Sequence, residues 1–256
     1  MKKLLTLSAL LFASLASAGT LRVGATPVPH AEILNFVKPT LAKQGVTLEI
    51  REFSDYVQPN LALADGSIDV NFFQHLPYLN EFQKNRPLGL VPGAKVHVEP
   101  IGLYSRRVKS LKELRSGATI AIPNDPSNSG RALKLLERAG LIRLKPGVGV
   151  TATVRDITTN LKRLRFRELE AAQLPRALAD VDAAVINTNY ALEAGLNPLK
   201  DALVLEDKRS PYANLLVAKP ATLKNPDYLK LVKALQSPEV KAFLLKKYGG
   251  AVVPAF

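Results

Sequence analysis

Residues 20–53 read TLRVGATPVPHAEILNFVKPTLAKQGVTLEIREF and contain a complete strand–helix–strand unit. Residues 20–25 and 46–53 are rich in aliphatic and β-branched side chains, which is typical of strands. Between them, apolar residues recur at helical spacing over residues 31–44, and Gly45 follows as the expected stop. Because a helix that joins two strands places them in parallel, this unit predicts an α/β fold.

The same alternation continues along the chain. Further strands are predicted at residues 67–70, 101–105, 118–122, 183–186 and 215–218, and further helices near residues 56–64, 111–114, 128–139, 226–235 and 238–248. The strand–helix blocks near residues 20–100 and 106–206 predict two lobes, each a mostly parallel sheet flanked by helices.

We expect lobe 1 to contain residues 19–104 and 209–256, because the tail returns to the first block, and lobe 2 to contain residues 105–208. The connecting segments near residues 98–104 and 205–211 are then candidate hinges beside an interlobe cleft. Since open α/β sheets bind ligands beyond the carboxyl ends of their strands, residues just after strands are the first candidates for a site.

The N-terminus predicts export. Lys2 and Lys3 precede an apolar run over residues 4–15, and residues 16–18 (ASA) form a small-residue cleavage site, the layout of a secretory signal peptide. Cleavage would leave Gly19 first, and the chain contains no cysteine. We therefore expect residues 1–18 to be removed, and the mature protein to be soluble, periplasmic and not lipid-anchored.

Composition argues against nucleic acid as a partner. The net charge is +13, but the basic residues are spread along the chain, apart from short clusters such as residues 162–167. A nucleic-acid binder would concentrate them in stripes with aromatic residues between them. A solvated basic surface explains the charge, and attraction to an acidic partner is the alternative.

The motifs of common enzymes are missing. The sequence has no Gly-x-Ser-x-Gly elbow, no P-loop and no His-Glu-x-x-His pair, and the glycines of residues 147–152 follow no convincing strand. His30, His75 and His97 could share a metal with a carboxylate, but they lack the paired spacing of metal ligands. We therefore expect no catalysis, no cofactor and no metal.

Polar and aromatic residues gather at three places beside predicted strands. Residues 71–78 (NFFQHLPY) suit either a pocket wall or an aromatic core. Residues 123–131 lead into a predicted helix whose first turn holds Arg131, where a ligand carboxylate or bulk water could meet the guanidinium. Residues 187–190 and 211–214 offer asparagines that could bind a ligand or form turns.

These segments together resemble the NlpA/MetQ family of methionine-binding receptors, in family order from the first mature strand to the C-terminus. The matching segments are residues 24–32 (GATPVPHAE), 55–60 (DYVQPN), 73–79 (FQHLPYL), 123–126 (PNDP), 130–131 (GR), 168–176 (ELEAAQLPR), 185–190 (VINTNY), 206–208 (EDK) and 210–215 (SPYANL).

The resemblance implies a two-lobed periplasmic-binding-protein fold and assigns roles by position. Arg131 would pair with the ligand carboxylate, Asn187 and Asn214 would hold the amino-acid head, and aromatic rings would surround the thioether side chain. The implied pocket residues are Tyr56, Phe73, His75, Tyr78, Arg131, Asn187 and Asn214, with Asn128 and Tyr190 as further members. Gly19 departs from the cysteine that many members carry at the mature N-terminus.

The resemblance also implies the biological role and the partners. The receptor would bind methionine, as the L and possibly the D enantiomer, and deliver it to an inner-membrane ABC permease and its ATPase, acting as a monomer. Two alternatives stay open: a receptor for another amino acid, a dipeptide or a small anion, and an envelope interaction protein without a ligand in the cleft.

Overall fold

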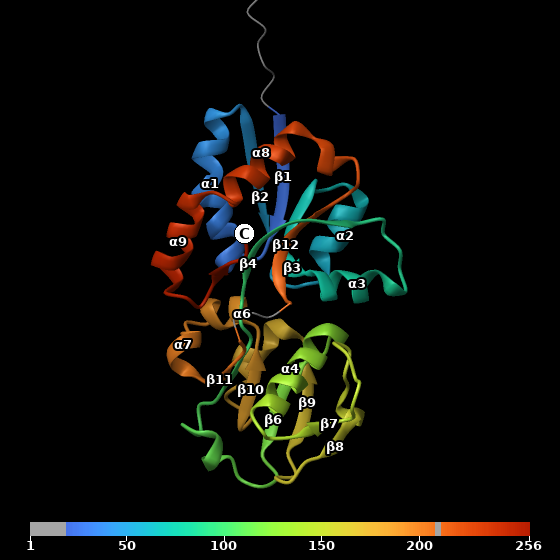
Figure 1. Ribbon diagram of the computed structural model, residues 1–256, viewed down its shortest axis with the longest axis vertical. Helices are drawn as coiled ribbons and strands as arrows, with labels where there is room; N and C mark the ends of the chain where they lie inside the picture. The colour runs from blue at the N-terminus through green and yellow to red at the C-terminus, as the bar shows by residue number, and fades with distance from the viewer. Residues whose placement is uncertain (1–18, 208–210) are drawn as a thin grey trace, which may run out of the picture.

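The computed structural model describes residues 19–207 and 211–256, and it has two lobes, one above the other in Figure 1. The predicted signal peptide, residues 1–18, and part of the second candidate hinge, residues 208–210, lie outside the described residues. None of the described helices is long and apolar enough to cross a membrane.

The upper lobe is built on a six-stranded sheet. Its strand order is β13 (Val253–Pro254), β4 (Val91–Val98), β12 (Ala213–Ala218), β3 (Val70–His75), β1 (Gly19–Ala25) and β2 (Val46–Glu52). Its helical segments are η1 (Pro27–Ala31), α1 (Glu32–Lys43), α2 (Gln58–Asp65), α3 (Leu76–Lys84), η5 (Thr222–Lys224), α8 (Pro226–Leu235) and α9 (Pro238–Tyr248). The apolar faces of α1, α8 and α9 pack with this sheet in one core cluster.

The lower lobe is built on a five-stranded sheet. Its strand order is β11 (Ala202–Leu205), β5 (Gly102–Tyr104), β10 (Ala183–Ile186), β6 (Thr119–Pro123) and β9 (Arg165–Leu169), and β7 (Arg143–Leu144) pairs separately with β8 (Ile157–Thr159). Its helical segments are η2 (Leu111–Glu113), α4 (Pro126–Arg138), η3 (Val154–Asp156), η4 (Ala171–Gln173), α5 (Leu174–Ala177), α6 (Thr188–Glu193) and α7 (Pro198–Asp201).

Both sheets are mixed, so the expectation of mostly parallel sheets is wrong in this detail. The strand–helix–strand units pair in parallel, as β1 does with β2 and β3, and β6 with β9 and β10. The chain passes from the upper sheet to the lower one between β4 and β5, and returns between β11 and β12 (Figure 1). The strands flanking these two crossings pair antiparallel with their neighbours.

The clearest error of the sequence prediction is the position of β3. The prediction placed a strand at residues 67–70 and a post-strand segment at residues 71–78. The strand runs from Val70 to His75, and all six of its residues are buried. It lies between β1 and β12 in the middle of the sheet. A strand covered on both faces shows no polar–apolar alternation, and so the pattern gave no signal.

Helix α4 begins two residues before the predicted start. Asp125 is its N-cap and accepts a hydrogen bond from the Asn128 backbone N–H, and Pro126 occupies the first helical position. Inside the helix, Gly130 lies against the loop before η3: a Cβ there would stand 2.1 Å from the Val150 carbonyl oxygen. This contact fixes the loop against the turn of α4 that carries Arg131.

Replacing Gly130 by alanine therefore tests the packing of α4. Helix propensity alone predicts a gain of about 1 kcal/mol, but the overlap with backbone atoms should instead destabilise the fold by about 1–3 kcal/mol. Chemical denaturation of the purified variant measures this change. Gly149→Ala is the matched control, since its Cβ would meet no atom within 4 Å. A Gly130→Ala protein as stable as the parent would contradict this account.

Candidate functional site

A cavity lies between the lobes. The upper lobe contributes residues from the loop before α2, from β3, from α3 and from β12, and the lower lobe contributes residues from α4 and from the segment after β10. The lining residues are Tyr56, Phe73, Gln74, His75, Tyr78, Glu99, Asn128, Arg131, Asn187, Thr188, Asn189 and Asn214.

Eight of the nine residues expected from the sequence line this cavity. The ninth, Tyr190, lies beside it: its ring centroid is 5.0 Å from that of Tyr56, and it lines a neighbouring hollow with Asp55 and Glu170. Asn214 lies within β12 and not in a loop before a strand, so its backbone is fixed by the ladders on both sides.

Aromatic rings form one wall of the cavity. The ring centroids of Tyr56 and Phe73 are 5.9 Å apart, and Tyr78 meets both rings edge-on. The hydroxyl of Tyr78 donates to the Tyr56 carbonyl oxygen at 2.8 Å. Burial raises the pKa of both phenols above the usual range, so they stay neutral. The wall offers apolar surface and no charge.

Arg131 is buried and lines the cavity, and its guanidinium is already paired within the protein. Its Nε donates to Oε1 of Glu206 at 3.0 Å, and its Nη2 donates to the same carboxylate and to the Glu99 carbonyl oxygen. It also lies over the Tyr212 ring, 4.2 Å from the centroid. None of its hydrogen bonds with described residues uses Nη1.

The helix position of Arg131 also differs from the prediction. Arg131 is the sixth residue of α4, beyond the first turn. The N-terminal dipole therefore acts on it less than we expected, because that effect falls off within one turn. Glu206, which follows β11, supplies the negative partner for the guanidinium.

A chain of amides joins the two lobes across the cavity. Nδ1 of His75 accepts from the Tyr78 backbone N–H, so Nε2 carries the proton and donates to Oδ1 of Asn128 at 3.2 Å. The same oxygen accepts from Asn187 at 3.0 Å, while the Asn128 amide donates to Asp125. Burial lowers the pKa of His75 to about 3, so it is neutral at pH 7.

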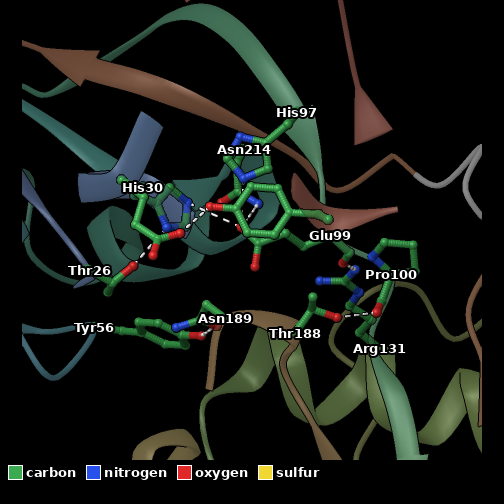
Figure 2. Close-up of polar contacts among 12 residues, drawn as sticks. Thr26, His30, Tyr56, His97, Glu99, Pro100, Arg131, Thr188, Asn189 and Asn214 are labelled. Atoms are coloured by element: carbon green, nitrogen blue, oxygen red, sulfur yellow. Dashed lines mark hydrogen bonds and ion pairs between the residues drawn. The ribbon is translucent and has the colours of Figure 1, made fainter. Parts of the chain in front are cut away.

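Two more hydrogen bonds join the lobes, and a third joins the lower lobe to the first crossing. The Tyr56 hydroxyl donates to Oδ1 of Asn189 at 2.6 Å, and the Tyr190 hydroxyl donates to the Ser54 carbonyl oxygen at 3.0 Å. Thr188 donates to the carbonyl oxygen of Pro100 on the first crossing (Figure 2). With these bonds formed, the lobes are in contact over the cavity.

Two polar atoms of the lining lack a partner in the described structure. They are Oδ1 of Asn187, an acceptor, and Nδ2 of Asn189, a donor, and both are buried. Buried polar groups are nearly always hydrogen-bonded, and an unpartnered one costs about 1–3 kcal/mol. An acceptor and a donor in one cavity fit a ligand that has both a donor group and an acceptor group.

Sequence reasoning missed four lining residues: Gln74, Glu99, Thr188 and Asn189. Three of them stand inside segments already singled out, where the neighbouring residue was chosen instead. Glu99 carried no such signal. Glu99 follows β4, a strand that the sequence pattern did not predict. It lies on the crossing between the two sheets, and this position places it at the cavity.

Two of the three histidines meet at Glu99, although sequence spacing gave no sign of it. Nε2 of His97 lies 2.7 Å, and Nε2 of His30 lies 3.2 Å, from Oε1 of Glu99 (Figure 2). These three ligand atoms lie within 4.8 Å of one another and could geometrically hold a metal. His75 is outside this group. The contact of His97 with Glu99 is at hydrogen-bond length, which fits a proton between the two atoms.

Comparison with known proteins gives related sequences over nearly the whole chain. The profile of the NlpA lipoprotein family matches residues 21–256. The D-methionine-binding lipoprotein MetQ of Escherichia coli (strain K12) is 48% identical over 213 residues, which are 82% of this chain and 79% of that protein.

These matches correct the expectation of an exported protein without a lipid anchor. Both the family and the Escherichia coli relative are named lipoproteins, as is the membrane lipoprotein TpN32 of Treponema pallidum, 44% identical over 92% of this chain and 88% of that protein. The expectation rested on Gly19 and on the lack of cysteine. Residues 1–18 lie outside the described structure. Agreement with the lipoprotein family along residues 21–256 outweighs an expectation that rested on Gly19 and on the missing cysteine.

Solved structures agree with the sequence comparison. A nutrient-binding protein from Burkholderia cenocepacia bound to methionine is 50% identical, with a TM-score of 0.89 over 92% of this chain and 100% of that one. An ABC transporter, periplasmic substrate-binding protein from Coxiella burnetii is 47% identical, with a TM-score of 0.88 over 92% of this chain and 100% of that one. With such matches spanning both lobes, this chain belongs to the NlpA lipoprotein family.

Proposed function

We propose that this protein is the substrate-binding protein of an ABC importer and binds methionine in the cavity between its lobes. The single observation that carries the proposal is the cavity itself, which combines an aromatic wall with a buried cation and an unpartnered buried amide donor and acceptor. Such a lining complements a small zwitterion with an apolar side chain.

The roles of the lining residues follow from their chemistry. Nη1 of Arg131 and Nδ2 of Asn189 are donors suited to the ligand carboxylate, while the side-chain oxygens of Asn187 and Asn214 suit its ammonium group. Tyr56, Phe73 and Tyr78 then surround the side chain, and a thioether gains about 0.3–1.5 kcal/mol from each contact with an aromatic ring. The methionine in the Burkholderia cenocepacia structure supports this choice of ligand.

Binding is proposed to work by closure of the lobes. The two crossings between the sheets would be the hinges, and because β5 (Gly102–Tyr104) belongs to the lower sheet, lobe 2 would begin before residue 102 and not at the expected residue 105. The hydrogen bonds from Tyr56 to Asn189 and from Tyr190 to Ser54 would form only in the closed state. The membrane permease and its ATPase would then recognise the closed monomer. The ATPase would carry out the ATP hydrolysis, and this protein would catalyse no reaction.

Calorimetric titration of the purified protein with L- and D-methionine tests the proposed function. The protein is first unfolded and refolded to remove any ligand retained from expression. At least one enantiomer should bind with micromolar or tighter affinity, while an amino acid with a charged side chain, such as lysine, should not compete. Absence of heat with both enantiomers would refute the proposal.

Arg131→Ala tests the position of the ligand carboxylate. The substitution should weaken methionine binding by about 1.5–3 kcal/mol or more, because a charged hydrogen bond is lost. It also leaves the buried carboxylate of Glu206 without its cation, so thermal unfolding must be recorded beside the titration. Arg138→Ala, at an exposed position on the same helix, should leave the affinity unchanged. Equal affinity of the Arg131→Ala protein and the parent would place the carboxylate elsewhere.

A further inference from the structure

The end of the lower lobe that lies away from the cavity is strongly basic. The cavity residues of this lobe follow the carboxyl ends of β6 and β10, and β6 pairs in parallel with β9 and β10, so the amino ends of these strands lie at the opposite end. The segments at the amino ends are residues 106–116, 161–165 and 180–182, toward the lower end of Figure 1. They contain eight basic against three acidic residues, a net charge of +5. We call this surface the basic pole.

Contacts between the three segments fix the basic pole in place. Nζ of Lys162 donates to the carbonyl oxygen of Leu114 at 2.5 Å, which joins the second segment to the first. Arg107 and Arg115 lie 3.5 Å and 3.4 Å from Oδ1 of Asp182, which joins the first segment to the third. The charges therefore stand on a defined surface of the folded lobe.

Most of the positive charge on the basic pole is not neutralised by the protein itself. Across residues 19–207 and 211–256, only Arg107 and Arg115 of the pole form ion pairs with a carboxylate. The carboxylate of Glu113 accepts hydrogen bonds from the Ser110 hydroxyl and the Lys109 backbone N–H. The exposed cations that form no ion pair within the described residues are Arg106, Lys109, Lys112, Arg163 and Arg165. Several like charges on one surface attract an anionic partner.

Beside these cations the fold holds an apolar side chain in solvent. Leu161 is 88% exposed, whereas Leu229, the next most exposed large hydrophobic side chain of the described residues, is 54% exposed. The turn is fixed by Asn160, whose Oδ1 accepts from the Leu164 N–H at 2.8 Å and whose Nδ2 donates to the Leu164 carbonyl oxygen at 2.9 Å. Arg163 in the same turn has a φ of 51°, in the left-handed region that favours glycine and asparagine. The turn thus presents a leucine next to cations.

The basic pole fits a broad anionic surface better than a small anion or a nucleic acid. A hollow in the pole is lined by Arg107 and Arg115, but both guanidinium groups already have Asp182 as a partner. None of the three segments contains an aromatic residue that could stack on bases. A bilayer with anionic headgroups attracts each nearby Lys or Arg, and an exposed leucine gains free energy by entering its interface.

A lipid surface is also the surface for which relatives of this chain are named. The chain belongs to the NlpA lipoprotein family, and TpN32 of Treponema pallidum is named a membrane lipoprotein. We propose that the basic pole binds the anionic phospholipid headgroups of a bilayer, with Leu161 inserted among them. The inference goes beyond the proposed function and does not depend on it, because the pole and the cavity lie at opposite ends of the lower sheet.

Flotation with lipid vesicles tests this inference. The purified protein is mixed with vesicles of phosphatidylcholine alone, or of phosphatidylcholine and phosphatidylglycerol in equal amounts. We expect a partition coefficient about 100-fold higher on the anionic vesicles, from several cations that each contribute near the surface. Raising the salt concentration from about 0.1 M to about 1 M, which shortens the Debye length from about 10 Å to about 3 Å, should remove most of this preference.

A triple variant shows whether the basic pole carries the preference. Arg106→Gln, Lys112→Gln and Arg163→Asn together remove three exposed cations that form no ion pair with the described residues, and asparagine tolerates the φ of position 163. The preference for anionic vesicles should fall to about tenfold or less. The matched control, Lys38→Gln with Lys43→Gln and Lys233→Gln, removes the same charge from exposed positions on α1 and α8 of the upper lobe. It should stay within about threefold of the parent.

Leu161→Ser tests the apolar part of the contact separately. The substitution should weaken binding to anionic vesicles by about threefold to tenfold, because a leucine side chain no longer leaves water. Since Leu161 is exposed, the thermal unfolding of this variant should match that of the parent. Methionine titration of all the variants should also match the parent, as none of the substituted residues lines the cavity.

Three results would overturn the inference. The first is equal partition of the parent protein onto neutral and anionic vesicles, which would favour an acidic protein as the partner of the basic pole. The second is a triple variant that keeps the full preference of the parent. The third is a control variant that loses as much as the triple variant, since net charge alone would then explain the binding. Each of these results leaves the proposed function standing.

Discussion

The buried contact of Arg131 with Glu206 and with the Glu99 carbonyl oxygen is the interaction on which the arrangement of the lobes depends. Arg131 belongs to α4 of the lower lobe, whereas Glu99 and Glu206 stand on the two crossings that connect the sheets. One guanidinium thus ties a helix to both connections at once. Breaking a buried pair by removing one partner costs about 3–5 kcal/mol, so this contact stabilises the fold as well as the site.

This contact also explains how a charged side chain can line the cavity while being almost completely buried. Arg131 is only 3% exposed, yet it lines the cavity, since the carboxylate and the carbonyl oxygen fix Nε and Nη2 and leave Nη1 without a hydrogen bond to the described residues. The neutral histidines act in a similar way on the opposite side. His97 holds Glu99 by a hydrogen bond, His30 lies beside the same carboxylate oxygen, and burial lowers the pKa of both rings.

Local signals allowed much of the fold to be predicted. Helix α4 was visible from its turn-rich start and its apolar spacing, and the helices near residues 226–235 and 238–248 were predicted with their observed bounds. Strand β3 was misplaced because burial on both faces removes the alternation that marks a strand. The antiparallel pairs beside the crossings were missed because they depend on where the chain leaves and re-enters a sheet, which no local pattern contains.

Site residues could be predicted where the neighbouring sequence marks them, and not where their role depends on contacts between distant parts of the chain. Tyr56, His75 and Asn187 stand in segments of unusual composition, and the structure brings them to one cavity. The role of Glu206 as partner of Arg131 could not be foreseen, because 75 positions separate them in the chain. Glu99 is a similar case, since its contacts with His30 and Asn214 arise only when three strands of the upper sheet have assembled.

The hydrogen bonds of Tyr56 with Asn189 and of Tyr190 with Ser54 have a kinetic consequence. Under the proposed closure, a molecule enclosed beneath them would leave only after both bonds have broken and the lobes have parted, so its residence time would reflect the opening rate of the protein more than the strength of its own contacts. A transporter that pulls the lobes apart would then set the moment of release, and the escape of ligand before docking would be slow.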